Sequence, residues 1–278
     1  MHATLSSCVS DLQVHMPASS SISVLESGWP CTADDASYIE EAGTWYNDHL
    51  NDIEESDQDE QIITDYDHVF WAGNVLWANL TDQGAFHTQA QNYLRQWICG
   101  STNIIQYTIK GRGWNPYSPS LGTTTNTAFL ALTYAEQKTS YISSAKANKY
   151  VCWARTQLRY VLGGAGRSLL VGWGKNPPTH AQNRAASCPS QNGNCGPENY
   201  LSPAANPHII TGAMVQQDAF GDTFDDIRNT NNTIVSLDTN AAVPGSLAGL
   251  HIAPGTWEQC LQGYGQLLHL NAACQTGL

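Results

Sequence analysis

The chain has few basic residues. Among its 278 residues, 12 Lys and Arg stand against 24 Asp and Glu, which gives a formal net charge of −12 at pH 7. A protein that binds nucleic acid or an anionic membrane surface needs clustered positive charge to neutralise phosphates. This composition therefore argues against both kinds of partner, whereas an uncharged polymer stays compatible with it.

Long apolar runs are also missing. No run of about 18 apolar residues occurs, the length that a membrane-spanning helix needs. The first 30 residues alternate Ser, Ala and Val with polar residues and show no basic start followed by an apolar core, so no signal peptide is predicted. No two cysteines have the close spacing of a zinc site, which argues against zinc with His180 or His208 as further ligands. We expect neither a metal nor another cofactor.

The cysteines that are present favour an oxidising compartment. Their number, eight, is even, and Cys188 and Cys195 flank a short loop rich in Gly, Asn and Pro that a disulfide would close. Sequons of the form N-x-[ST] begin at Asn79 and Asn231 and fit a secreted protein. We therefore expect an extracellular or secretory-pathway protein with disulfides.

Helical periodicity dominates the chain and predicts an all-α fold of about six helices joined by long loops. Residues 1–36 are expected to be an irregular lead, and residues 37–278 one helical domain. The apolar pattern predicts helices from Ser37 and over 69–80, 86–97, 126–136, 145–162, 240–251 and 257–270.

Residues 167–188, RSLLVGWGKNPPTHAQNRAASC, form the most informative of the predicted loops. An apolar run that should be buried is followed by Trp173 between two glycines, a pattern typical of a tight turn. Pro177 and Pro178 fix two φ angles and remove two backbone donors, so a rigid loop is predicted over 175–184. Rigid loops on a scaffold are common places for functional sites.

Aromatic residues occur in the loops as well as in the helical patterns. Nine Trp and twelve Tyr outnumber five Phe, a balance that suits stacking on sugars and also suits ordinary helical cores. Trp114, Tyr117 and Trp173 lie in predicted loops, so we take them as candidate stacking surfaces.

Several motifs, which occur in the same order along the chain, resemble those of glycoside hydrolase family 9, the cellulase family of inverting endoglucanases. They are YTIKG at 107–111 with GTTTNTAFLALTYA at 122–135, the loop over 168–189, NPHIITGA at 206–213, and DTFDDIR at 222–228 with DTNA at 238–241. The resemblance covers about residues 38–270 and the C-terminal half of the family barrel. It implies an (α/α)6 toroid, here a partial barrel, and hydrolysis of β-1,4-glucan with inversion.

The resemblance also places family site positions on this sequence. Arg184, Asp226 and Arg228 match the family pattern, whereas Gln182 stands where the family has its loop histidine. The family's general-acid glutamate is replaced by Ile234. Asp238 is a candidate replacement acid, and the alternative is a carboxylate at the start of a helix.

Several of these positions have alternative interpretations. Asp226 is either an active-site carboxylate or half of a structural ion pair with Arg228. His180 is either a displaced replacement for the loop histidine or a packing residue. Gln182 can hydrogen-bond a sugar hydroxyl but cannot pass a proton. Binding of glycan is therefore easier to retain than turnover.

The sequence leaves two candidate functions, that of an endoglucanase and that of a catalytically impaired glycan-binding or structural protein. The Asp-Ala-Gly-Asp element of the family's general base is absent from this sequence. A half barrel would expose an apolar flank, so a partner chain or an N-terminal half is expected to cover it. The candidate catalytic residues are Asp226 and Asp238, and the candidate substrate-binding residues are Gln182, Arg184, His180, Trp173, Trp114, Tyr117 and Arg228.

Overall fold

The computed structural model describes residues 62–100, 104–137, 139–189, 194–217, 219–228 and 230–253, with single positions at 40, 41, 43, 44, 48, 255, 258 and 260. The predicted irregular lead over 1–36 lies outside these residues, as does most of the predicted helix over 257–270. The described positions between 40 and 48 are helical, as predicted from Ser37.

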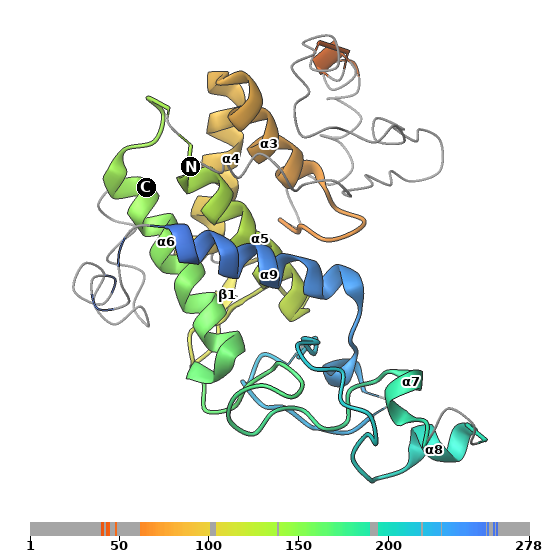
Figure 1. Ribbon diagram of the computed structural model, residues 1–278. Helices are drawn as coiled ribbons and strands as arrows, with labels where there is room; N and C mark the ends of the chain where they lie inside the picture. Colours follow the sequence, from red (N-terminus) through yellow and green to blue (C-terminus); the bar gives the residue numbers. More distant parts are fainter. Residues whose placement is uncertain are drawn as a thin grey trace, which may run out of the picture.

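Helices dominate the described part of the chain, which confirms the predicted all-α class (Figure 1). The long helices are α3 (Phe70–Thr81), α4 (Gly84–Cys99), α5 (Leu121–Ala135), α6 (Ser144–Arg159) and α9 (Leu237–Ile252). Shorter elements are η2 (Tyr160–Gly164), α7 (Arg184–Ser187), α8 (Pro197–Leu201) and η3 (Asn231–Thr233). The loop region with α7 and α8 projects from one end of the helical part.

A short hairpin precedes α5 where a loop was predicted. Strands β1 (Gln106–Tyr107) and β2 (Gly113–Trp114) pair antiparallel, with Gln106 opposite Trp114. Gly113 lies against the ring of Trp97, so a side chain at this position would collide with the core. The hairpin therefore packs directly against the helices.

Helix α5 is the centre of the helical part and packs against both α6 and α9. Helices α5 and α9 run in the same direction, since Gly122 meets Thr239 at one end and Leu132 meets Gly249 further along. Gly245 lies against Phe129 in the same way. Small residues on α9 let the two helix axes approach closely, so the contact is extensive.

The first turn of α5 is a correction to the sequence analysis, which predicted a start at Asn126. The helix begins at Leu121, and the hydroxyl of Ser120 accepts a hydrogen bond from the backbone N–H of Gly122. Successive threonines disfavour a helix by their local propensity. Here they are buried, and Thr124 donates to the carbonyl of Gly113 (2.8 Å). Tertiary hydrogen bonding therefore outweighs the local preference.

A polar cluster ties the α3–α4 turn to the far end of α5. His87 is 1% exposed, and its ring nitrogens lie 2.8 Å from the hydroxyl of Tyr134 and 2.9 Å from Oδ1 of Asp82. Hydrogen bonds from Thr139 and His87 lower the pKa of Asp82. The cluster lies at the opposite end of α5 from the loops described below.

Two disulfides are present in the described residues. Cys188–Cys195 confirms the predicted bridge over a short loop, and Cys152–Cys260 joins α6 to a segment 108 residues further along. None of the helices in the described ranges is long and apolar enough to cross a membrane.

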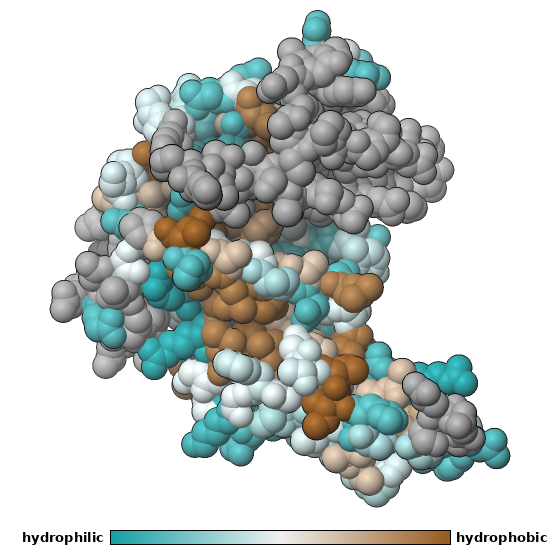
Figure 2. All heavy atoms as spheres, viewed as in Figure 1, coloured by the Kyte–Doolittle hydropathy of each residue, from teal (hydrophilic) through white to brown (hydrophobic). Residues whose placement is uncertain are grey.

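Helix α9 is apolar on the side that faces away from α5 as well as on the side that meets it. Figure 2 shows hydrophobic surface along this helix and between it and the loops. The exposed apolar residues Leu237, Ala241, Pro244, Ala248 and Ile252 repeat at helical spacing, and Leu247, Asp238 and His251 are exposed beside them. An apolar helix face of this kind is normally buried against a neighbouring element. This α9 stripe therefore has the character of the open flank that the sequence analysis expects.

Candidate functional site

Three helices begin at one end of the molecule, which we call the loop face. Asp65 precedes α3, Ser118 precedes α5, and Asp238 lies in the first turn of α9. The hydroxyl of Ser118 donates to Oδ2 of Asp65 (3.4 Å). A hydrogen bond to Asp67 and the charges of Asp67, Asp65 and Asp238 raise the pKa of Tyr66, so these carboxylates lie near its hydroxyl.

Extended segments of the long loops run side by side next to this end. Leu170 forms an isolated bridge with Met214, and the run around Leu170 is buried as predicted. The N–H of Gln216 donates to the carbonyl of Ile234 (3.0 Å), and the N–H of Gln182 donates to the carbonyl of Thr233 (2.7 Å). Gln182 and Ile234 also form a parallel bridge. The structure therefore brings together the positions that match the family's loop histidine and general acid.

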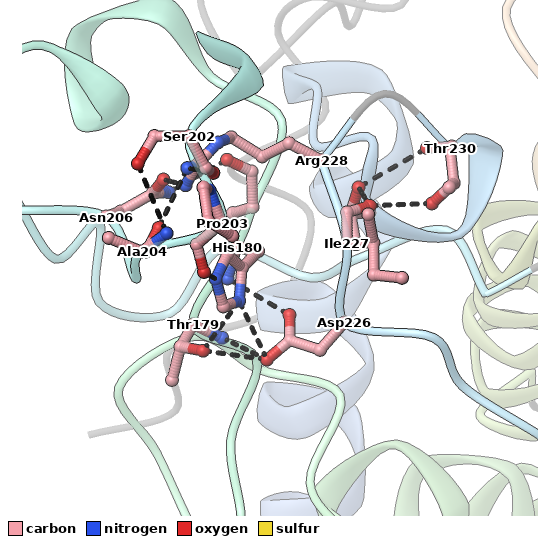
Figure 3. Close-up of polar contacts among 12 residues, drawn as sticks. Thr179, His180, Ser202, Pro203, Ala204, Asn206, Asp226, Ile227, Arg228 and Thr230 are labelled. Carbon is pink, nitrogen blue, oxygen red and sulfur yellow. Dashed lines mark hydrogen bonds and ion pairs between the residues drawn. The ribbon is translucent and has the colours of Figure 1, made fainter. Parts of the chain in front are cut away.

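Asp226 holds the loop that carries Pro177 and Pro178. Its Oδ2 accepts from the N–H and the hydroxyl of Thr179, both at 2.8 Å, and its Oδ1 accepts from the N–H of His180 at 3.0 Å (Figure 3). Burial acts to raise the pKa of Asp226, but these hydrogen bonds and the charge of His180 outweigh it and lower the pKa. Both carboxylate oxygens are therefore engaged in a structural contact.

Arg228 holds a different loop, and no ion pair between it and Asp226 occurs in the described structure. Its side chain is 5% exposed and donates to the carbonyls of Tyr200 (2.9 Å) and Ala204 (2.8 Å). It also donates to the carbonyl of Ser202 and to Oδ1 of Asn206 (Figure 3). The guanidinium group thus satisfies a set of loop acceptors, and the ion-pair alternative for Asp226 was wrong.

His180 has partners within the same loops. Its Nε2 lies 3.0 Å from the carbonyl oxygen of Pro203, and its Nδ1 lies 3.6 Å from Oδ2 of Asp226. These contacts are those of a packing residue. Gln182 is half-buried, and Arg184 is exposed at the first position of α7.

Asp238 is exposed in the first turn of α9. Ser236, not Asp238, is the N-cap, and its hydroxyl accepts from the N–H of Thr239 (3.4 Å). A carboxylate in the first turn is favourable because the N-terminal end of a helix is electropositive. Its position is that of the helix-start alternative, four residues after Ile234.

The candidate stacking residues differ in their exposure. Trp173 is 59% exposed between two glycines with positive φ, Gly172 (68°) and Gly174 (77°), so the predicted tight turn is present. Tyr117 is 56% exposed. Trp114 is half-buried on β2 and contacts Phe220, with ring centroids 4.9 Å apart. Two of the three rings are therefore free to meet a ligand.

Asp65 and Tyr66, which belong to the loop face, and Thr179, which bonds to Asp226, were not predicted as site residues. The signal available for the first two was their position immediately before an apolar helix. Nothing in the spacing of Thr179 indicated its partner 47 residues away. In the described part of the chain, no cluster of His, Cys, Asp or Glu side chains is arranged to hold a metal ion.

Replacing Asp226 by Asn is expected to remove an acid-dependent part of the stability. The folded state lowers the pKa of this carboxyl, so its contribution is present above the ordinary carboxyl pKa and is lost as pH falls through the lowered value. Unfolding by urea between pH 2 and pH 7 should therefore show a smaller pH dependence for Asp226→Asn than for the unsubstituted chain. The exposed Asp238→Asn variant is the matched control. Equal pH dependence in all three proteins would contradict this role of Asp226.

Comparisons with known proteins agree with this geometry. The family profile described as glycosyl hydrolase family 9 matches residues 27–247. Endoglucanase 4 of Bacillus sp. strain KSM-522 is 31% identical over 221 residues, which are 74% of this chain and 33% of that protein. Endoglucanase 1 of Persea americana is 27% identical over 237 residues, 79% of this chain and 47% of that protein.

Solved structures show the same fold. An endoglucanase from the termite Nasutitermes takasagoensis superposes with a TM-score of 0.67 at 29% identity, covering 78% of this chain and 47% of the termite chain. An endoglucanase from Clostridium thermocellum complexed with cellotetraose gives a TM-score of 0.65 at 25% identity, with 78% and 35% covered. The chain thus spans less than half the length of these relatives, and its helices form part of an (α/α)6 toroid. This chain belongs to glycosyl hydrolase family 9.

Proposed function

We propose that this chain binds β-1,4-glucan on its loop face and does not hydrolyse it through the family's acid position. One observation carries the proposal: the backbone still pairs the acid position with the loop-histidine position, but the residues there are Ile234 and Gln182. Neither side chain can transfer a proton at ordinary pH. The backbone pairing of these two positions is therefore present, but their side chains cannot transfer a proton.

The two candidate catalytic aspartates, Asp226 and Asp238, do not supply that chemistry in this geometry. Inverting hydrolysis uses a general acid, whose pKa must be raised, and a general base about 6.5–9.5 Å from it. The pKa of Asp226 is lowered, because Thr179 and His180 donate to both of its oxygens. Asp238 is exposed at a helix start. The lowered pKa of Asp226 therefore does not support a general-acid role for it. Asp238 is not buried, so its surroundings do not provide the burial that would raise its pKa.

Binding needs less than turnover. Stacking on an exposed ring and hydrogen bonds to hydroxyls suffice for a neutral sugar. Trp173 and Tyr117 are exposed, and the Gln182 amide lies in the same loop region. A relative of known structure is complexed with cellotetraose, which supports a cello-oligosaccharide as the ligand class.

Hydrolysis of β-1,4-glucan is the second candidate function, and one feature favours it. Carboxylates gather around Tyr66 at the loop face, and Asp238 is among them. An exposed carboxylate there is free to meet a substrate. If the chain turns over glucan, we expect Asp238 to be required and Asp226→Asn to act mainly through stability.

The decisive experiment measures binding and turnover on the same preparation. We expect cellotetraose to bind in calorimetry, with no release of reducing sugar from soluble cellulose derivatives. Trp173→Ala should weaken binding about tenfold, which corresponds to about 1.4 kcal/mol. The matched control is Tyr141→Ala, which removes another exposed ring at the other end of α5.

Two outcomes would contradict the proposal in different ways. Release of reducing sugar that disappears in Asp238→Ala would favour the endoglucanase function. Absence of cellotetraose binding in a folded sample would reject the loop face as a glucan site.

We also infer where the domain works and what covers it. Disulfides Cys188–Cys195 and Cys152–Cys260 support an extracellular or secretory setting, because such bonds persist in oxidising compartments. The α9 stripe fits the other half of a family 9 barrel as its cover, since relatives of about twice the matched length form the toroid. In such a ring the neighbouring helix would bury the apolar side chains of the stripe.

A further inference from the structure

A cavity of about 250 Å³ lies beside the loop face, and neither Gln182 nor Asp226 lines it. It is bounded by the turn of the β1–β2 hairpin, the end of η2 and the segment before Asp226. The chain around Gln216 is hydrogen-bonded to the start of α5, because the N–H of Leu121 donates to the carbonyl of Gln216 (2.7 Å). Its lining includes Lys110, Tyr160, Arg167, Gln217, Asp222 and Phe224.

The polar wall of this cavity is held in one arrangement. The hydroxyl of Tyr160 donates to Oδ1 of Asp222 (2.7 Å), and the backbone N–H of Lys110 donates to Oδ2 (2.8 Å). The side-chain amide of Gln217 donates to the hydroxyl of Tyr160 (3.0 Å). Burial and the neighbouring Asp222 raise the pKa of Tyr160, so the hydroxyl keeps its proton. Oxygen acceptors of a preformed network therefore face the cavity.

The backbone of the wall is strained at two positions. Gln217 has a φ of 40° and Asp222 a φ of 56°, although neither is glycine. Left-handed conformations of such residues are unfavourable and persist only where the surroundings enforce them. The hydrogen bonds of Asp222 and Gln217 supply that enforcement here.

Two cations line the same cavity. Arg167 lies with its guanidinium carbon 4.3 Å from the centroid of the Phe224 ring, and its Nε is buried without a hydrogen-bond partner. Lys110 is exposed and also lines the cavity. Within the described residues, no ion pair joins Lys110 or Arg167 to a carboxylate. In a chain with a net charge of −12, a cavity with two such cations can compensate an anionic ligand.

The volume of the cavity and the chemistry of its lining residues limit which anion it can bind. A volume of about 250 Å³ suits one sugar ring and not a longer chain. Guanidinium matches a carboxylate in a two-pronged geometry. With Asp222 set against Lys110 and Arg167, the lining carries a formal charge of +1, which one singly charged carboxylate neutralises. Tyr160, Gln217 and Asp222 can meet ring hydroxyls.

We infer that this cavity binds a carboxylate-bearing sugar, a uronic-acid unit on a β-glycan, with Lys110 and Arg167 at the carboxylate. The inference rests on the proposed glucan binding for the rest of the ligand. The chain would then prefer acid-substituted glycan over neutral glucan. No bond is made or broken at this cavity.

The test compares three ligands by calorimetry: cellotetraose, the same oligosaccharide with one glucuronic acid unit, and free glucuronate. We expect the acidic oligosaccharide to bind about tenfold more tightly than cellotetraose at low salt. Arg167→Met and Lys110→Met should each reduce this preference, and added salt should reduce it as well. Arg95→Met is the matched control, because Arg95 is exposed on α4, outside the cavity.

The outcomes separate this inference from the proposed function. Equal affinity for acidic and neutral oligosaccharides would overturn the uronic-acid site and leave glucan binding standing. Loss of preference in Arg95→Met as well would show an unspecific charge effect and also overturn it. If cellotetraose does not bind but NMR shifts around Phe224 report glucuronate binding that Arg167→Met abolishes, the cavity stands and the proposed function fails.

Discussion

Replacing Arg228 by Met is expected to lower the free energy of unfolding by about 3–5 kcal/mol. The side chain is 5% exposed and donates to three carbonyls and to the amide oxygen of Asn206. Methionine keeps much of the volume but donates nothing. Each buried acceptor left unpaired costs about 1–3 kcal/mol, and partial access of water to the loosened loop reduces the sum. The loop over 200–206 should lose its fixed conformation first.

Urea unfolding followed by fluorescence measures this effect, and Arg184→Met is the matched control. Arg184 is exposed on a neighbouring part of the loops, so its replacement should change the free energy of unfolding by less than about 0.5 kcal/mol. The experiment also separates two roles of Arg228. Unchanged stability together with lost affinity for cellotetraose would make Arg228 a binding residue and contradict the structural role.

Removal of the Cys152–Cys260 disulfide by replacing both cysteines with Ala is expected to cost about 4–5 kcal/mol. The bond joins residues 108 positions apart, and cross-linking a loop of about 100 residues restricts the unfolded chain by about 4.7 kcal/mol in the chain-entropy account. Both cysteines are buried, at 7% and 1% exposure, so the cavities left by sulfur add to the loss. Helix α6 should lose its attachment to the C-terminal segment.

The Cys188–Cys195 bridge is an internal control for that account. It spans a separation of seven residues, for which the same relation gives about 2.5 kcal/mol. Urea unfolding of the two double-alanine variants, without reductant, should therefore rank the long-loop variant as the less stable. The reverse ranking would show that contacts in the folded state, not loop length, decide the effect.

The helical pattern was a good guide where side-chain burial follows the period of the helix. Helices α3, α4 and α6 begin and end within a few residues of the predicted bounds, because their apolar residues recur on one face. The start of α5 could not be predicted in this way. Its threonines disfavour a helix locally, and only the carbonyl of Gly113 and the core around it make their burial favourable.

The sequence indicated candidate site residues but not the partners that fix their side chains. Motif spacing placed Gln182, Asp226 and Arg228 in one region, and the structure brings their loops together. Spacing could not show that Asp226 bonds to Thr179, nor that Arg228 bonds to the carbonyls around Ser202. These partners lie more than 20 residues away, so their pairing depends on how the loops fold.

The amino-acid sequence by itself determined the helical class, the family and the absence of a proton-transferring side chain at positions 182 and 234. Those properties follow from residue identity, periodicity and order along the chain. Only the tertiary structure decided that Asp226 and Arg228 hold loops, and that Lys110 and Arg167 share a cavity. Hydrogen bonds, burial and charge act between residues that are close in space, and for these residues the fold creates that proximity.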